Sequence, residues 1–397
     1  MWLYGSAGAG KSAIAQTFAE MCEKDGRLLA SFFFGRSDAT RDDAKFLIPT
    51  IACQVYSSIP GARQHIISAV DNDPLIFERT LLVQLLSLVI EPLKQLGDTI
   101  SQNVIIIDGL DECLDTASQT TILRTLFEAV RAQSCHIRFL IASRPEHVIV
   151  TAFSLQSNSI LARLVLDDTY KPDDDIRLYL NDKIQGIKET HPFRHLIPQE
   201  WPGDALVNEI VKKSSGQFIY VFTVVKFIES NRHRPDHRLE IVRNLRPAQG
   251  DMPFKELDAL YTHILSSVED TATVVELLSF ILLAVQIDRY PYPMIPIQTS
   301  VASMEDIHDI ERGCFKLVVC DLGSLLVIDQ KDTVKVMHTS LLDYLLDPSR
   351  CKGLAISGEE LIAKHITTCF RFLSSAYTIL KQIFYYLKIC PSRKHIQ

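Results

Sequence analysis

Hydrophobic positions in the first 166 residues follow two patterns that alternate along the chain. Short apolar runs predict strands at 28–34, 103–107, 137–142 and 160–166. The run at 103–107 is too continuous for a half-exposed strand and predicts a buried parallel one, and the run at 137–142 predicts another buried strand. Between most of these runs, apolar residues recur every three or four positions and predict helices at about 44–58, 80–96 and 117–132. The alternation predicts a parallel α/β sheet as the fold of this region.

Beyond residue 166 the pattern becomes mainly helical. Pro172 and the three aspartates after it predict a helix N-terminus, because acidic side chains favour the positive end of the helix dipole, and a helical region extends to about 246. Helices at 254–268 and 271–286 then precede a short hairpin, 325–328 and 333–337, which predicts a winged-helix-like domain. We therefore expect four parts: an NTPase domain at 1–166, a helical domain at 167–250, a winged-helix-like domain at 251–350 and a C-terminal helical segment at 351–397.

Near the start of the chain, the short apolar strand Trp2-Leu3-Tyr4 is followed by eight residues of the form G-x-x-x-x-G-K-[ST]. They are Gly5, Ser6, Ala7, Gly8, Ala9, Gly10, Lys11 and Ser12. Apolar residues at helical spacing come next: Ile14, Ala15, Phe18, Ala19 and Cys22. A strand, a glycine-rich turn and a helix in this order predict a phosphate-binding loop.

The residue types of this loop suit a nucleoside triphosphate. Backbone N–H groups must surround the phosphates, and glycines let the main chain approach them closely. Lys11 is expected to reach the β- and γ-phosphates, and the Ser12 hydroxyl is expected to ligate Mg²⁺. The helix that follows directs its N-terminal dipole at the phosphates. We therefore expect ATP or ADP with Mg²⁺ as ligands, and the loop does not exclude GTP.

A second motif lies at 104–112, where an apolar run ends in carboxylates. Asp108, at the tip of the predicted strand, is expected to complete the metal site with Ser12 by holding the water shell of Mg²⁺. Asp111 or Glu112 is expected to orient or deprotonate an attacking water. An acidic turn after a strand is common by itself, and this one gains weight because a complete phosphate loop precedes it.

The next apolar run ends in a cation. Arg144 follows the predicted strand at 137–142 directly after Ser143. At the end of a strand beside the phosphate loop, Arg144 is expected to sense the γ-phosphate. The alternative is a surface arginine that caps the strand.

Together, these motifs resemble the NACHT-type NTPases of the STAND class, particularly the large fungal group. The resemblance rests on the phosphate loop, the D-G-L-D-E form of 108–112 and the A-S-R-P form of 142–145. Residues 215–220 and 223–228 are similar to the helical-domain signature of fungal members. Residues 336–345 resemble the winged-helix histidine motif. Met337-His338 also matches two residues of the plant M-H-D motif, from which Thr339 departs.

The resemblance implies a signalling switch, closed with ADP and open with ATP, with slow hydrolysis as its reset. It implies that His338 contacts the terminal phosphate of the diphosphate, and the alternative is a core histidine satisfied by its neighbours. It also implies a homo-oligomer on activation, protein effector or sensor partners, a cytoplasmic location and a role in fungal non-self recognition or programmed cell death. Related proteins carry an N-terminal effector domain and C-terminal repeats, so we expect a truncated switch module.

Charge bears on the choice of partner. Winged helices often bind DNA, but residues 251–350 carry 7 Lys+Arg against 16 Asp+Glu, which is the wrong sign for nucleic-acid recognition. The 397-residue chain is 47% hydrophobic, and its apolar runs are too short to predict a membrane span. Its nine cysteines show no C-x-x-C spacing, so the sequence indicates neither a zinc site nor a disulfide framework.

Two other functions stay open at the level of sequence. A continuously turning, AAA+-like remodelling ATPase of ring type would use the same loop and acidic strand. It also needs an arginine supplied by a neighbouring subunit and a substrate pore, and the sequence assigns neither. The other is a truncated fragment that is too incomplete to function. Steady-state turnover separates switch from motor, because about 1 per second or faster is the ordinary range for enzymes.

Overall fold

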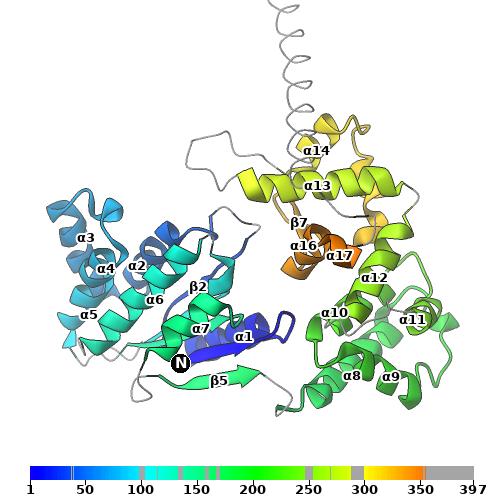
Figure 1. The fold of residues 1–397 in the computed structure, drawn as a ribbon, viewed down its shortest axis with the longest axis horizontal. Helices are drawn as coiled ribbons and strands as arrows, with labels where there is room; N and C mark the ends of the chain where they lie inside the picture. The colour runs from blue at the N-terminus through cyan, green and yellow to red at the C-terminus, as the bar shows by residue number, and fades with distance from the viewer. Residues whose placement is uncertain are drawn as a thin grey trace, which may run out of the picture. The chain divides into compact units, whose positions relative to one another are not determined.

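The structure is a computed structural model (Figure 1). It describes residues 1–354 apart from 37, 39, 98–102, 114, 133–136, 157–160, 167–169, 246–253, 269, 288–298 and 352–353. The chain divides into two compact units, Met1–Asn244 and Leu245–Gln397. Most of the C-terminal helical segment predicted at 351–397 lies outside the described residues.

A five-stranded parallel sheet forms the centre of the first unit, which confirms the predicted fold class (Figure 1). In spatial order its strands are β2 Leu28–Phe33, β3 Val104–Asp108, β4 Arg138–Ser143, β1 Trp2–Gly5 and β5 Arg163–Leu166. Because all five strands run the same way, their carboxyl ends meet at one edge, where ligands of open α/β sheets bind. The β4 strand lies between β1 and β3, so its end lies between the phosphate loop and the acidic turn.

Helices cover both faces of the sheet, which is why every residue of β3 is buried. The helices of this part of the chain are α1 Lys11–Lys24, α2 Leu47–Ser58, α3 Arg63–Asn72, α4 Leu81–Leu85, α5 Glu91–Lys94, α6 Thr116–Arg131 and α7 His147–Ser154, of which α1 and α2 contact the strands directly. A π-helical stretch, Leu86–Ile90, joins α4 to α5. Side chains of β3 alternate between two cores: Ile105 packs with residues of α2 and α6, and Ile106 packs with residues of α1.

Helix α1 turns its small residues to the sheet. Ala15, Ala19 and Cys22 are at most 6% exposed, whereas Ile14 and Phe18 are 43% and 36% exposed. Small side chains spaced four and three residues apart let the helix axis approach the strands closely. Of the apolar residues that the helical spacing grouped together, only the small ones therefore reach the core.

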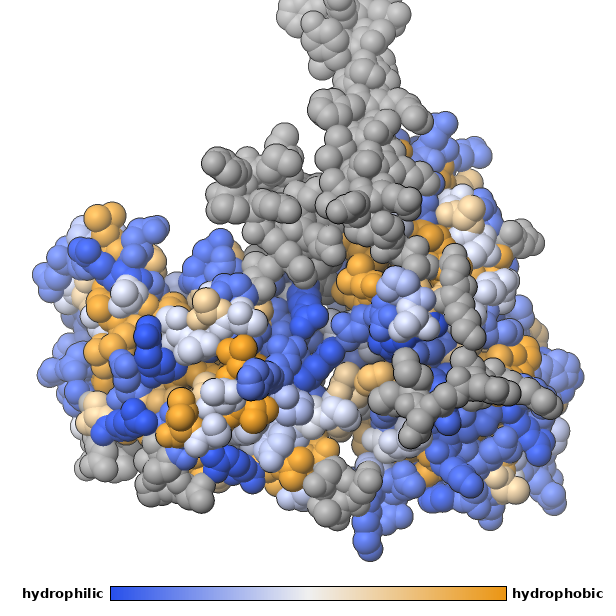
Figure 2. All heavy atoms as spheres, viewed as in Figure 1, coloured by the Kyte–Doolittle hydropathy of each residue, from blue (hydrophilic) through white to orange (hydrophobic). Residues whose placement is uncertain are grey.

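The rest of the first unit is a group of helices, α8 Pro172–Thr190, α9 Asp204–Ser214, α10 Phe218–Ile228 and α11 Pro235–Asn244. As predicted, α8 begins at Pro172 with three aspartates in its first turn. Helix α10 packs against α8, α9 and α11, and it is hydrophobic nearly all round, as a central buried helix must be. On the face shown in Figure 2, this group presents a largely hydrophilic surface.

The second unit contains helices and the predicted hairpin. Its elements are α12 Lys255–Ser266, α13 Thr271–Ile287, α14 Val301–Ile307, α15 Phe315–Val318, β6 Leu326–Ile328, β7 Val334–Val336, α16 Thr339–Leu346 and α17 Pro348–Cys351. Strands β6 and β7 pair antiparallel. Asp329 stabilises the turn between them, since a hydrogen bond from the Thr333 N–H and one from Lys335 lower the pKa of Asp329 to about 2. Within the described ranges, no helix is long and apolar enough to cross a membrane.

Polar contacts fasten α12 to the end of this unit. The Arg350 guanidinium donates to both carboxylate oxygens of Asp258, at 2.7 and 3.1 Å. The hydroxyls of Tyr261 and Ser340 lie 2.8 Å apart in a buried position. Helices α16 and α17 are therefore held to α12 by buried and partly buried polar contacts as well as by packing.

Candidate functional site

The phosphate loop has the backbone form that its glycines predict. Gly8 and Gly10 have φ angles of +76° and +89°, in the left-handed region that favours glycine. Gly10 directly precedes α1, so the loop leads straight into the helix N-terminus.

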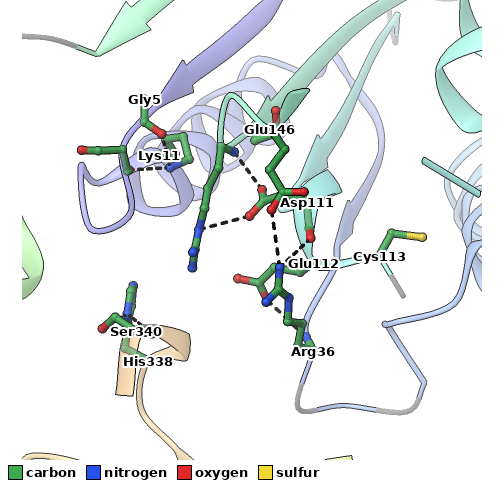
Figure 3. A network of polar contacts seen from close by, with 12 residues as sticks. Gly5, Lys11, Arg36, Asp111, Glu112, Cys113, Glu146, His338 and Ser340 are labelled. Carbon is green, nitrogen blue, oxygen red and sulfur yellow. Dashed lines mark hydrogen bonds and ion pairs between the residues drawn. The ribbon is translucent and has the colours of Figure 1, made fainter. Parts of the chain in front are cut away.

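Lys11 lies against its own loop. Its Nζ donates to the carbonyl oxygens of Gly5 at 3.0 Å and Ser6 at 2.8 Å (Figure 3). Burial lowers the pKa of Lys11, and the nearby carboxylates, Asp111 first among them, act in the opposite direction. The amine therefore sits in a desolvated position close to carboxylates, where its charge acts strongly on any anion nearby.

Asp108 ends β3 and is 4% exposed. Burial raises the pKa of this carboxyl, and a hydrogen bond with the Ser12 side chain lowers it. In the part of the chain that the structure describes, Asp108 Oδ1 is buried without a hydrogen-bond partner. A buried carboxylate oxygen without a partner, next to a serine hydroxyl, fits a hard cation such as Mg²⁺, which prefers oxygen ligands.

Asp111 and Arg144 form an ion pair. Asp111 is 3% exposed; the backbone N–H of Arg144 donates to its Oδ1 at 2.9 Å, and Arg144 Nε lies 3.2 Å from its Oδ2. The sequence singled out both residues but not their contact. The predicted phosphate sensor is thus bound to one of the two predicted catalytic carboxylates.

Glu112 contacts a residue that the sequence analysis missed. Burial raises the pKa of Glu112, as does neighbouring Asp111, while a hydrogen bond from the Arg36 backbone N–H lowers it. That N–H lies 3.2 Å from Glu112 Oε2, and the Arg36 guanidinium reaches the Asp111 carbonyl at 3.0 Å and Glu146 at 3.6 Å (Figure 3). The sequence did offer one sign of this role: Arg36 follows the strand predicted at 28–34, so it lies at the carboxyl edge of the sheet.

The helical segment 215–220 lies on the phosphate loop, a contact that its sequence did not predict. The N–H of Ile219, in the first turn of α10, donates to the Gly8 carbonyl at 3.3 Å. A Cβ atom on Gly8 would lie only 2.2 Å from Ile219 Cγ2, and one on Gly10 would lie 3.6 Å from the Phe218 ring. Gly8 thus serves two purposes, since it allows the loop's turn and also the close approach of α10, whereas a Cβ on Gly10 would make only an ordinary van der Waals contact.

His338 lies in the second unit and precedes α16 as its N-cap. Its Nδ1 accepts the Ser340 N–H at 3.0 Å and lies 2.7 Å from Ser340 Oγ. Because Nδ1 accepts a backbone N–H, a neutral ring carries its proton on Nε2. Nδ1 therefore contacts Ser340, as the alternative of a histidine satisfied by its neighbours predicted. The contact between His338 and a phosphate stays a prediction, and such a contact would have to use Nε2.

The fold and the loop define an α/β protein with a P-loop-like domain. Residues 1–144 match a family model described as the N-terminal region of nephrocystin 3. The matched residues are less than half of this chain. No curated protein matches the chain. A solved structure titled "Structure of Drosophila ORC bound to DNA" is similar at a TM-score of 0.36 and 12% identity, covering 90% of each chain. At that TM-score the likeness assigns no property to this protein.

The contact between Gly8 and Ile219 yields a testable expectation. Gly8→Ala should destabilise the first unit by about 1–3 kcal/mol, because the new methyl group meets Ile219 and the backbone has a positive φ. Adding Ile219→Ala removes the Cγ2 atom that clashes most, but a tight 3.0 Å approach to the Cβ of residue 219 and the backbone strain remain. The double variant should therefore recover part of the loss. Urea denaturation of the three variants and wild type measures this. If the two single losses simply add, α10 does not lie on the loop in solution.

Proposed function

We propose that this chain is a nucleotide-controlled switch of the NACHT and STAND kind, which binds ATP or ADP with Mg²⁺ and hydrolyses ATP slowly. The observation that carries the proposal is the gathering of Lys11, Ser12, Asp108 and the Asp111–Arg144 pair at the carboxyl edge of one parallel sheet. Its biological setting follows the sequence resemblance: self-association on activation, effector or sensor proteins as partners and a cytoplasmic role in defence or cell death.

Each binding residue has a defined part in this proposal. Loop N–H groups and Lys11 hold the phosphates, and Lys11 exchanges the carbonyls of Gly5 and Ser6 for phosphate oxygens. The Ser12 hydroxyl and the buried Oδ1 of Asp108 hold Mg²⁺. When bound, the metal neutralises charge on the transferring phosphoryl group.

Glu112 is the general base of the proposed hydrolysis. Asp111 is held by Arg144, whereas Glu112 has a pKa raised by burial, which makes its carboxylate a stronger proton acceptor. The sequence left the choice between the two carboxylates open, and the ion pair favours Glu112.

Arg144 gives the switch its sensitivity to the γ-phosphate. Its guanidinium is bound to Asp111 here, and its side chain is still 21% exposed. A γ-phosphate offers the same cation a second anionic partner, because guanidinium groups bind carboxylates and phosphates alike. Sensing then consists of Arg144 turning from Asp111 to the phosphate.

The first test of this function concerns Lys11. Nucleotide at 100 times its dissociation constant should stabilise the wild-type protein by about 2.7 kcal/mol, and Lys11→Ala should lose this stabilisation. Lys24→Ala, at the exposed far end of the same helix, is the control and should behave as wild type. Thermal melts with and without Mg-nucleotide measure the shift, and an equal shift in wild type and Lys11→Ala would disprove the proposed binding mode.

A second test separates hydrolysis from binding. Glu112→Gln should leave nucleotide affinity nearly intact and slow single-turnover hydrolysis at least tenfold, a loss of about 1.4 kcal/mol in transition-state stabilisation. Asp111→Asn should lower the melting temperature more than Glu112→Gln does, because it removes the carboxylate that pairs with Arg144. An unchanged single-turnover rate in Glu112→Gln places the base elsewhere. Steady-state turnover of about 1 per second or more in wild type would favour a motor over a switch.

The third test concerns His338. His338→Asn keeps a side-chain acceptor that can cap α16 and removes the ring with its Nε2 donor. Losing one charge-assisted hydrogen bond of roughly 1.5–3 kcal/mol should weaken ADP binding roughly 10- to 150-fold and affect a non-hydrolysable ATP analogue less. Parallel titrations of the two nucleotides measure the difference. Equal losses for both would remove His338 from the nucleotide site.

A further inference from the structure

Arg36 makes three contacts with the acidic side of the site (Figure 3). Its backbone N–H donates to the Glu112 carboxylate at 3.2 Å. Its Nη2 donates to the Asp111 carbonyl oxygen at 3.0 Å and lies 3.6 Å from Glu146 Oε1. One residue at the end of β2 therefore touches two consecutive residues of the acidic turn and the segment that follows Arg144.

The acidic turn has little structure of its own to fix it. It is a single 3₁₀ turn, Leu110–Glu112, that begins after Gly109 at a φ of +68°. Short 3₁₀ turns have poor hydrogen-bond geometry, so contacts from outside decide where their side chains point. Arg144 fixes the side chain of Asp111, and the Arg36 guanidinium fixes the backbone of Asp111. The side chain of Glu112 is held by the Arg36 backbone N–H, which a substitution at position 36 would keep.

We propose that Arg36 is a positioning residue of the acidic turn: its guanidinium holds the Asp111 carbonyl and so keeps the turn where the Glu112 carboxylate meets the Arg36 backbone N–H. We call the hydrogen bonds from Arg36 to Asp111 and Glu112 the clamp. The clamp rests on the geometry alone, whereas its effect on catalysis rests on the proposed function. A guanidinium suits this task because its donors form a rigid fork that can bind a carbonyl and a carboxylate together. The side chains of Arg36 and Glu146 are 30% and 37% exposed, so solvent weakens their mutual contact and leaves the guanidinium's hydrogen bond to the Asp111 carbonyl as the stronger part.

Arg36 also acts on the charge of Glu112. The charged groups near this carboxyl include Asp111, Arg36, Arg144 and Lys11. The two arginines lower the pKa that burial and Asp111 raise. Removing the Arg36 guanidinium should therefore raise the pKa of Glu112 further, so that the base is protonated at a higher pH. The charge role therefore predicts that the rate falls at a higher pH than in wild type, whereas the positioning role predicts a lower rate at every pH.

The clamp can be tested without nucleotide, because Cys113 follows Glu112 directly. Its thiol is 3% exposed in the core beneath the turn, and Cys22, 5% exposed on the other face of the sheet, is an internal reference. In Arg36→Ala, alkylation of Cys113 should become about tenfold faster while that of Cys22 stays constant, read by mass spectrometry. Arg41→Ala is the matched control, since Arg41 is in the same loop and pairs with Asp38. Unchanged protection of Cys113, or equal acceleration at both cysteines, would overturn the proposal.

The catalytic consequence is measured on the same variants. Arg36→Ala should slow single-turnover hydrolysis tenfold or more, with less than a twofold change in the nucleotide dissociation constant. In a plot of the hydrolysis rate against pH, the fall on the acid side should move to higher pH. Arg36→Lys, which keeps the cation without the fork, should recover part of the rate and part of the Cys113 protection. If wild type binds nucleotide and shows no hydrolysis, the proposed function is wrong and the alkylation result still decides the clamp. A wild-type hydrolysis rate in folded Arg36→Ala would overturn the positioning role.

Discussion

The ion pair between Asp111 and Arg144 organises the carboxyl edge of the sheet. Asp111 is 3% exposed, and a carboxylate that deep is costly unless a cation and hydrogen bonds satisfy it. Arg144 supplies both, with its backbone N–H and its guanidinium. It can do so because β4 lies between β1 and β3, so that the end of β4 lies beside both the phosphate loop and the acidic turn. The strand order thus determines which cation meets which carboxylate.

A second constraint joins the loop to the helices that follow the sheet. The Gly8 carbonyl accepts the Ile219 N–H, and the glycine leaves no room for a side chain between loop and helix. Any rearrangement of the loop on binding phosphate must therefore move α10 or break that hydrogen bond. Helix α10 is buried among α8, α9 and α11, so a displacement at its N-terminus is passed on to the whole group, because packed cores transmit strain.

Much of the sheet was predictable because buried parallel strands are continuous apolar runs. The strand predicted at 103–107 is Val104–Asp108, and the one predicted at 137–142 is Arg138–Ser143. The edge strand Arg163–Leu166 is shorter than the run that predicted it, and α3 was missed because Ile66 is its one buried residue. The motifs indicated Lys11, Asp108, Asp111, Glu112 and Arg144 as candidates. Arg36 was not among them, since its role depends on β2 lying beside β3, and spacing along the chain does not determine strand order.

In the proposed switch, the Asp111–Arg144 pair makes the state with Arg144 on the γ-phosphate higher in protein free energy than the state with Arg144 on Asp111. An arginine that leaves Asp111 for a γ-phosphate exchanges one charge-assisted contact for another, so the cation itself loses little. Asp111, by contrast, would remain buried without its ion-pair partner, and the charge of Lys11 and the backbone N–H of Arg144 would compensate it only in part, so the exchange costs free energy. The triphosphate must offset this cost through its differential affinity for the two states. Loss of the γ-phosphate on hydrolysis would then return Arg144 to Asp111, so the resting pair supplies the driving force for the reset.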